Sequence, residues 1–97
     1  MTKQDALRRI ARHSDELRQM GVKSLALFGS VARGESTRAS DADFLVEFQR
    51  PVGYFHFLDV QERLETILGA KRVDLVRREA VLDELRDIIY SEAVNAL

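Results

Sequence analysis

Asp41 and Asp43 are two carboxylates separated by one residue, in a stretch that alternates between apolar and polar side chains. On a β-strand, residues at positions i and i+2 project from the same face, about 6 to 7 Å apart along the backbone. Aspartate is depleted in strands, and two neighbouring negative charges repel each other unless a cation lies between them. Mg²⁺ prefers hard oxygen ligands and often combines one or two carboxylates with substrate phosphates. The pair therefore predicts a magnesium site, although a charged, solvent-facing strand edge is the simpler interpretation of two such aspartates alone.

Gly29 and Ser30 form a candidate phosphate-binding turn, with ten residues between Ser30 and Asp41. They follow an apolar segment and open a short helical one, so backbone N–H groups and the positive end of a helix are expected to face a phosphate. Glycine permits close approach of the backbone, and the Ser30 hydroxyl adds a donor. Arg33, one short turn later, is a further phosphate-binding candidate, and a solvated surface arginine is its alternative.

Asp74 is a third carboxylate, and it lies inside the apolar segment from Val73 to Val76. An aspartate in such a strand lowers stability unless it is paired, hydrogen-bonded or bound to a metal. We expect it to join the two earlier aspartates; a strand-end salt bridge with Arg72 or Arg77 is the alternative.

The segments that must position these residues are predicted from the apolar periodicity and the turn residues. Their order indicates an α/β (α+β) fold, with a small β-sheet flanked by helices in the order α-β-α-β-α-β-α. The final helix is expected to carry Leu82, Leu85, Ile88 and Ile89 on its apolar face. Four helices are predicted: one that begins at the cap Thr2 and ends at Gly21, a short one over 31–33, one between Gly53 and Gly69, and one over about 81–93. Three strands are predicted, over 22–28, about 41–48 and 72–76.

The composition narrows the class of protein. With 97 residues, the chain is expected to form a single domain over residues 1–97. Its 15 basic and 16 acidic residues give a formal charge of -1, which argues against direct nucleic acid binding. The absence of cysteine excludes disulfides and thiolate metal sites. No apolar run is long enough for a membrane span and the N-terminus is unlike a signal peptide, so a cytoplasmic location is expected.

Taken together, the Gly-Ser pair, the ten-residue spacing, the D-x-D pair and the later Asp74 resemble one known family. They are similar to the signature G-S-x(10)-D-x-D of the nucleotidyltransferase superfamily, which includes DNA polymerase beta and the aminoglycoside nucleotidyltransferases. The residues from Phe28 to Gly34 strengthen the resemblance, which extends over essentially the whole chain. It implies a nucleotidyltransferase core built on a small mixed β-sheet.

The resemblance also implies a role for each matching residue. Asp41, Asp43 and Asp74 would be the catalytic carboxylates and would hold Mg²⁺, with two ions expected. Asp74 would also help to position or deprotonate the attacking hydroxyl. Gly29 and Ser30 would bind the terminal phosphates of ATP. This arrangement suits displacement at the α-phosphorus, in which two cations stabilise the attacking and leaving oxygens.

The chain has almost nothing beyond this core, and it resembles the minimal nucleotidyltransferases (MNT proteins) of bacteria and archaea, which are usually paired with a HEPN-domain partner. That resemblance implies an antitoxin that transfers AMP from ATP to a tyrosine of a HEPN ribonuclease toxin and forms a hetero-oligomer with it. The aromatic residues near Tyr54 and the final helix are expected contact regions. Two alternatives stay open: a non-catalytic antitoxin that acts by binding, and a small-molecule nucleotidyltransferase whose acceptor is bound by another chain.

Overall fold

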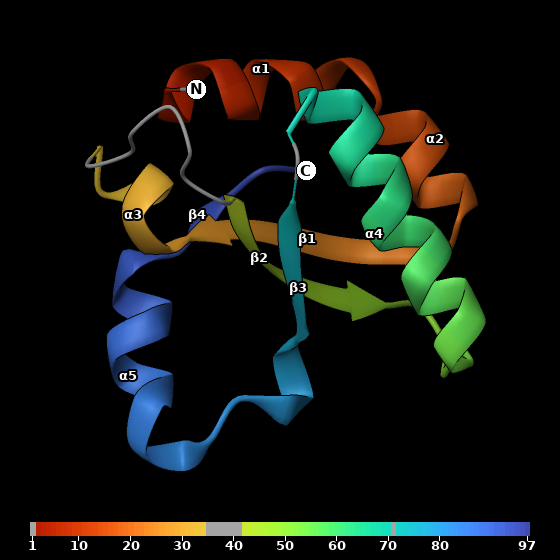
Figure 1. Cartoon of the computed structure of the whole chain (residues 1–97). Helices are drawn as coiled ribbons and strands as arrows, with labels where there is room; N and C mark the ends of the chain where they lie inside the picture. The colour runs from red at the N-terminus through yellow and green to blue at the C-terminus, as the bar shows by residue number, and fades with distance from the viewer. Residues whose placement is uncertain (1, 35–41, 71) are drawn as a thin grey trace.

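The computed structural model describes residues 2–34, 42–70 and 72–97, and it confirms an α/β architecture with a sheet flanked by helices (Figure 1). Asp41 lies outside the described residues. Among the described helices, none has the length and apolar character that crossing a membrane requires. The elements in chain order are α1 (Lys3–Arg12), α2 (Ser14–Gln19), β1 (Val22–Phe28), α3 (Gly29–Ala32), β2 (Ala42–Phe48), α4 (Tyr54–Leu68), β3 (Val73–Arg77), the 3-10 turn η1 (Arg78–Ala80), α5 (Asp83–Glu92) and β4 (Val94–Asn95).

The sheet is mixed, with strand order β3-β2-β1-β4. Strand β1 pairs antiparallel with β2 and with β4, whereas β2 and β3 are parallel neighbours. Helix α4 makes the crossover between those two parallel strands, and it ends at Gly69, which adopts a left-handed conformation with φ 64°. Because the two parallel strands run side by side, the starts of β2 and β3 lie at the same end of the sheet.

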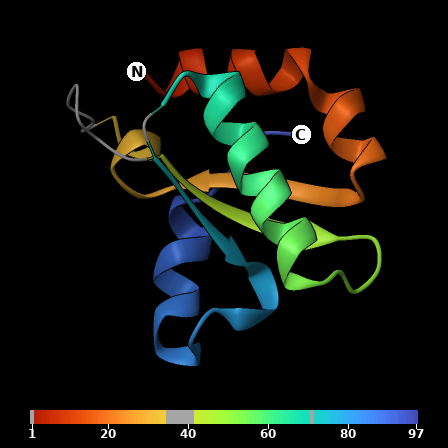
Figure 2. The same cartoon turned by 45° about the vertical axis from the view of Figure 1, so that its right-hand side comes forward.

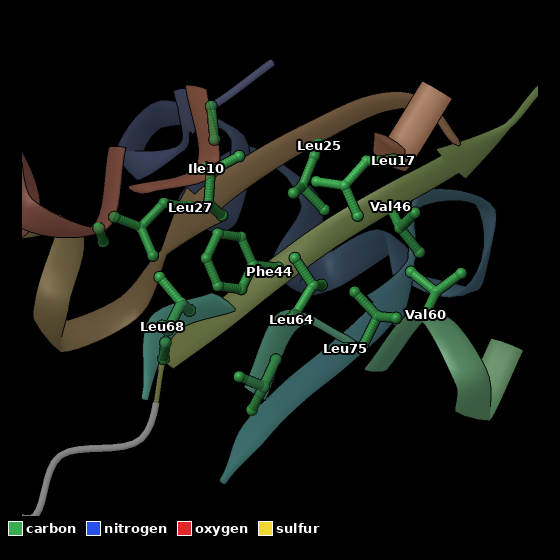
Figure 3. Close-up of a cluster of buried hydrophobic side chains, with 14 of the residues drawn as sticks. Ile10, Leu17, Leu25, Leu27, Phe44, Val46, Val60, Leu64, Leu68 and Leu75 are labelled. Carbon is green, nitrogen blue, oxygen red and sulfur yellow. The ribbon is translucent and has the colours of Figure 1, made fainter. Parts of the chain in front are cut away.

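One face of the sheet carries the main hydrophobic core, which α1, α2 and α4 cover (Figures 1 and 2). Strand β2 shows the predicted alternation, because Ala42, Phe44 and Val46 belong to this core. Phe44 is fully buried near its centre (Figure 3). The helices and the other strands contribute mainly leucine, isoleucine and valine, including Ile10, Leu17, Leu25, Leu27, Val60, Leu64, Leu68 and Leu75.

The opposite face of the sheet is covered more sparsely, by α5 alone among the described helices (Figure 2). Its smaller core contains Ala26 from β1 and Leu45 from β2, and Ile89 and Tyr90 of α5 pack against it. Strand β1 is therefore buried on both faces in its middle.

Several boundaries differ from the prediction. The first helix is interrupted at His13, where the backbone leaves helical geometry (φ -115°, ψ 16°) and the His13 ring pairs with Glu16. The third strand begins at Val73, not Arg72. Strand β4 was not predicted at all, because two residues show no periodicity.

The expected apolar face of the last helix was only partly correct. Helix α5 contains no buried residue, and Leu82, Leu85 and Ile88 are exposed. Of the four apolar residues expected on that face, only Ile89 packs against the sheet. Periodicity identified the helix correctly but could not indicate that most of its apolar side chains face away from the sheet.

Candidate active site

Asp43 and Asp74 are direct neighbours across the parallel pair of strands β2 and β3. Adjacent strands lie about 4.8 Å apart, so two carboxylates project from one face at this short separation. That face is the one covered by α5, since Asp43 has the same strand parity as Leu45. The fold therefore brings together two of the three carboxylates that the sequence singled out, while Asp41 lies outside the described residues.

Gly29 lies directly against Asp43, at the point where β1 ends and α3 begins. Its φ of +77° is in the region that disfavours side chains. A Cβ added to this residue would overlap with Asp43 Oδ2 and would lie 3.1 Å from Asp43 Cγ. The lack of a side chain thus allows the backbone of the predicted phosphate-binding turn to approach the carboxylate closely.

Ser30 and Arg33 belong to the same turn but differ in their surroundings. Helix α3 starts at Gly29, one residue before Ser30, and its N-terminus has no side-chain cap. Arg33 follows the helix, and its Nη1 donates to Oε2 of Glu92 on α5 at 3.0 Å. The structure thus gives Arg33 a described partner; a phosphate-binding role for it stays a prediction.

Asp74 pairs with Arg72, whose Nε lies 3.3 Å from Asp74 Oδ1. This is the salt bridge that the sequence left open as an alternative role for Asp74. The pair is partly exposed, with 41% of the Asp74 side chain accessible, so its contribution to stability is small. A salt bridge of this kind leaves room for a second interaction at the carboxylate.

Arg77 and Arg78 lie away from this group of residues, at the opposite end of β3 from Asp74. The Arg77 guanidinium packs over the rings of Phe57 and Phe48, at 4.8 and 5.7 Å from their centroids. Arg78 stacks on Tyr90 at 4.9 Å. These contacts give both arginines a packing role; neither is brought to the carboxylates.

A hollow of about 370 Å³ adjoins the turn after α3. Its size is within the range of small-ligand sites. Lys3, in the first turn of α1, brings a positive charge that no motif in the sequence had indicated. The lining residues are Thr2, Lys3, Gln4, Ala32, Arg33 and Gly34.

The donor atoms of this site fit a hard divalent cation. Asp43 and Asp74 supply carboxylate oxygens from neighbouring strands, and two negative charges so close together favour a bound cation. Within residues 2–34, 42–70 and 72–97, no three potential metal-ligating side chains form a cluster. Chemically, the arrangement can hold Mg²⁺ between carboxylates next to a backbone turn suited to phosphate.

The sequence and the fold are both similar to those of known proteins. Residues 10–95 match the family model described as a nucleotidyltransferase domain. The protein adenylyltransferase MntA of Thermococcus cleftensis is 37% identical over 83 residues, which cover 84% of this chain and 83% of that protein. A solved structure assigned as a minimal nucleotidyltransferase has a TM-score of 0.82 at 31% identity and covers 97% of this chain and 95% of its own. The complex of a tri-AMPylated HEPN toxin of Shewanella oneidensis with MNT antitoxin has a similar fold, with a TM-score of 0.67 at 17% identity over 95% of this chain and 71% of that chain.

Proposed function

Because the chain belongs to the nucleotidyltransferase family, whose relatives include protein adenylyltransferases, we propose a specific reaction for it. It transfers AMP from ATP to a tyrosine hydroxyl of a HEPN-domain ribonuclease toxin in the cytoplasm. The modification neutralises the toxin, which makes this chain the antitoxin. Similarity to a complex that contains an AMPylated HEPN toxin supports the choice of partner and of the transferred group.

The observation that carries the proposal is the contact of Gly29 with Asp43, beside Asp74. A phosphate bound at the backbone of Gly29 and Ser30 would lie next to both carboxylates, as transfer at the α-phosphorus requires. Asp41, Asp43 and Asp74 would hold two Mg²⁺ ions, which supply stabilisation of negative charge on the phosphoryl oxygens. Arg33 would add a further positive charge on the triphosphate.

In the proposed reaction, this chain binds ATP and positions the reacting groups, and the partner supplies the acceptor hydroxyl. The tyrosine oxygen attacks the α-phosphorus, a new O–P bond forms, and the bond to the bridging oxygen breaks, so that pyrophosphate leaves. Asp74 would position the hydroxyl or take its proton, a role that a partly exposed carboxylate on the correct face can perform. The acceptor comes from the partner.

The reaction can be tested by incubating the protein with ATP, Mg²⁺ and the product of the neighbouring gene, which the proposal expects to be a HEPN-domain toxin. We expect the mass of the partner to rise by one or more AMP groups and pyrophosphate to accumulate. The variant with Asp41→Ala and Asp43→Ala is the control and should give no adduct. A wild-type protein that leaves the partner unmodified, or a double variant that modifies it equally well, would contradict the proposal.

A binding-only antitoxin is the second candidate, and the exposed apolar residues of α5 favour it. Such a protein would neutralise its toxin by covering it, without transfer of AMP. The same variant, with Asp41→Ala and Asp43→Ala, separates the two functions in cells that produce the toxin. If binding alone neutralises the toxin, cells with this variant should grow; if AMP transfer is needed, they should not.

A further inference from the structure

Helix α5 and the residue before it carry an apolar row on their outer side. Leu82, Leu85 and Ile88 are 62%, 46% and 58% exposed, and they follow one another at a spacing of three residues. Residues at this spacing lie on one side of a helix. Single exposed leucines are ordinary, whereas a contiguous exposed row on one element indicates a contact surface.

The helix that carries this row covers the same face of the sheet as the carboxylates. Ile89 packs in the cluster built on Ala26 and Leu45. Leu45 is two residues from Asp43 along β2, so both side chains leave the sheet on one face. A protein bound to the outer side of α5 would therefore lie on the side of the molecule where the carboxylates are.

The row also leads toward the phosphate-binding turn. Ile88 is one helical turn before Glu92, about 6 Å along the helix axis. Glu92 in turn holds Arg33, at 3.0 Å, directly after α3. Figure 1 shows α3 next to the C-terminal end of α5, in agreement with this contact. A partner centred on Leu85 and Ile88 would be within reach of the nucleotide.

The charge around the row indicates what kind of surface fits it. Between Asp83 and Glu92 the helix has four acidic residues and one basic residue, Arg86. Asp83 pairs with Arg86 at 3.1 Å and Glu92 pairs with Arg33, so the acidic groups beside the row that no described ion pair neutralises are Glu84, one turn before Ile88, and Asp87. The complementary surface is an apolar patch bordered by lysine or arginine. A ribonuclease offers such a border, since it must bind RNA phosphates with basic side chains.

We propose that Leu82, Leu85 and Ile88, with the acidic residues around them, form the surface on which the toxin docks to present its acceptor tyrosine. This inference rests on the proposed function, because the occupant is the protein substrate. It assigns no docking role to the second exposed apolar pair, Tyr54 and Phe55, which are 67% and 82% exposed. Those residues follow the far end of β2, about 16 Å along the strand from Asp43, and so are remote from the reacting groups.

The test compares a double variant, Leu85→Ser with Ile88→Ser, with the matched control Phe55→Ser. Binding of the proposed HEPN-domain partner is measured by calorimetry, transfer of AMP by mass spectrometry, and binding of a fluorescent ATP analogue with Mg²⁺ by titration. Loss of apolar anchors at the centre of an interface should weaken partner binding by roughly 30-fold or more. Transfer at low partner concentration should fall in parallel, whereas nucleotide binding and the far-UV circular dichroism spectrum should not change. Phe55→Ser should behave like the wild type.

Four other outcomes would decide against the docking surface, against the transfer reaction or against both. Equal partner affinity of the wild type and the double variant overturns the docking surface and leaves the transfer reaction intact. A wild-type dimer that becomes monomeric in the double variant, with unchanged partner affinity, identifies the row as a self-association surface instead. Partner binding that depends on the row without any transfer supports the docking surface and overturns the reaction. No partner binding by the wild type overturns both.

Discussion

Gly29 must be a glycine for two reasons, its backbone conformation and its close contact with Asp43. The residue has a φ of +77°, and the space where a Cβ would lie is occupied by the Asp43 carboxylate. A left-handed conformation of a residue other than glycine costs about 1–3 kcal/mol. The contact with Asp43 adds a local displacement, so a substitution here affects the site as well as the fold.

Gly29→Ala is therefore expected to reduce AMP transfer by about 100-fold, the scale associated with a shift of about 1 Å in a reacting group. Gly21→Ala is a matched control, because Gly21 lies before β1 at its opposite end and has a similar φ of +88° but no atom of the described residues within 4 Å of its added Cβ. Both variants should lose comparable stability in urea unfolding, and only Gly29→Ala should lose most of its activity. Equal activity in the two variants would rule out the importance of the Asp43 contact.

Asp74→Asn is expected to lower the transfer rate by about 10²- to 10⁴-fold, the usual contribution of a positioned acid–base group. Its stability should change little, because the salt bridge with Arg72 is exposed and worth about 0–1 kcal/mol. Arg72→Gln removes the same ion pair and keeps the carboxylate. Single-turnover kinetics should thus show a large effect for the first variant and a small one for the second; similar losses would mean that Asp74 acts only through its salt bridge.

Part of the site could be predicted from residue types and spacing, and part could not. Strand alternation placed Asp43 on one face, and the glycine followed by serine marked the turn. The pairing of Asp43 with Asp74 depends on the strand register, which no local pattern encodes. The contact of Arg33 with Glu92 joins residues far apart in the chain, so only the fold reveals it.

At the scale of the elements, Glu16 connects α2 to α4 through an ion pair with Arg63, and it also pairs with His13 at 3.1 Å. The hydrogen bond from Arg63, followed by that from His13, lowers the pKa of Glu16 below its ordinary value of 4.5. A lowered pKa in the folded state means that the carboxylate stabilises the fold above pH 4.5. The stabilisation is lost as the pH falls through the folded-state pKa.

The difference in unfolding free energy between the wild type and Glu16→Gln should therefore be constant near neutral pH and shrink below about pH 4.5. Urea unfolding across this range measures it. Glu62→Gln, on the exposed side of α4, controls for the loss of one negative charge. A difference that grows on acidification would show that the linkage has the opposite sign.

The elements themselves were largely predictable, and their exceptions have physical causes. The strands β1 and β2 and the helix α4 have long, clear periodic patterns. Strand β4 has two residues and exists only because Val94 and Asn95 reach the edge of β1. The amphipathic pattern of helix α5 is the same whether its apolar side packs against the sheet or against a partner protein. Periodicity therefore could not indicate which side of the helix is exposed.

For the whole molecule, most of the packing depends on one core on one side of the sheet. Phe44 is fully buried there, and Phe44→Ala should cost about 3–5 kcal/mol. A domain of this size has a total stability of about 5–15 kcal/mol, so the variant should be only marginally folded. Urea unfolding monitored by circular dichroism measures the loss. Phe55→Ala, at an 82% exposed position, should stay within about 0.5 kcal/mol of the wild type, and a comparable loss at both positions would contradict this description of the core.

The contact between Arg33 and Glu92 has a consequence for the energetics of the whole assembly. It joins the turn that would bind ATP to the helix that would bind the toxin, so the two ligands need not bind independently. Linkage then requires reciprocity: whatever factor ATP applies to the affinity for the toxin, the toxin must apply to the affinity for ATP. Glu92→Gln should weaken this coupling, so that ATP no longer changes the affinity for the toxin and the toxin no longer changes the affinity for ATP. Calorimetric titrations with the two ligands added in either order measure both effects. An antitoxin built in this way would respond to the nucleotide supply of the cell at the step of toxin capture, before any AMP is transferred.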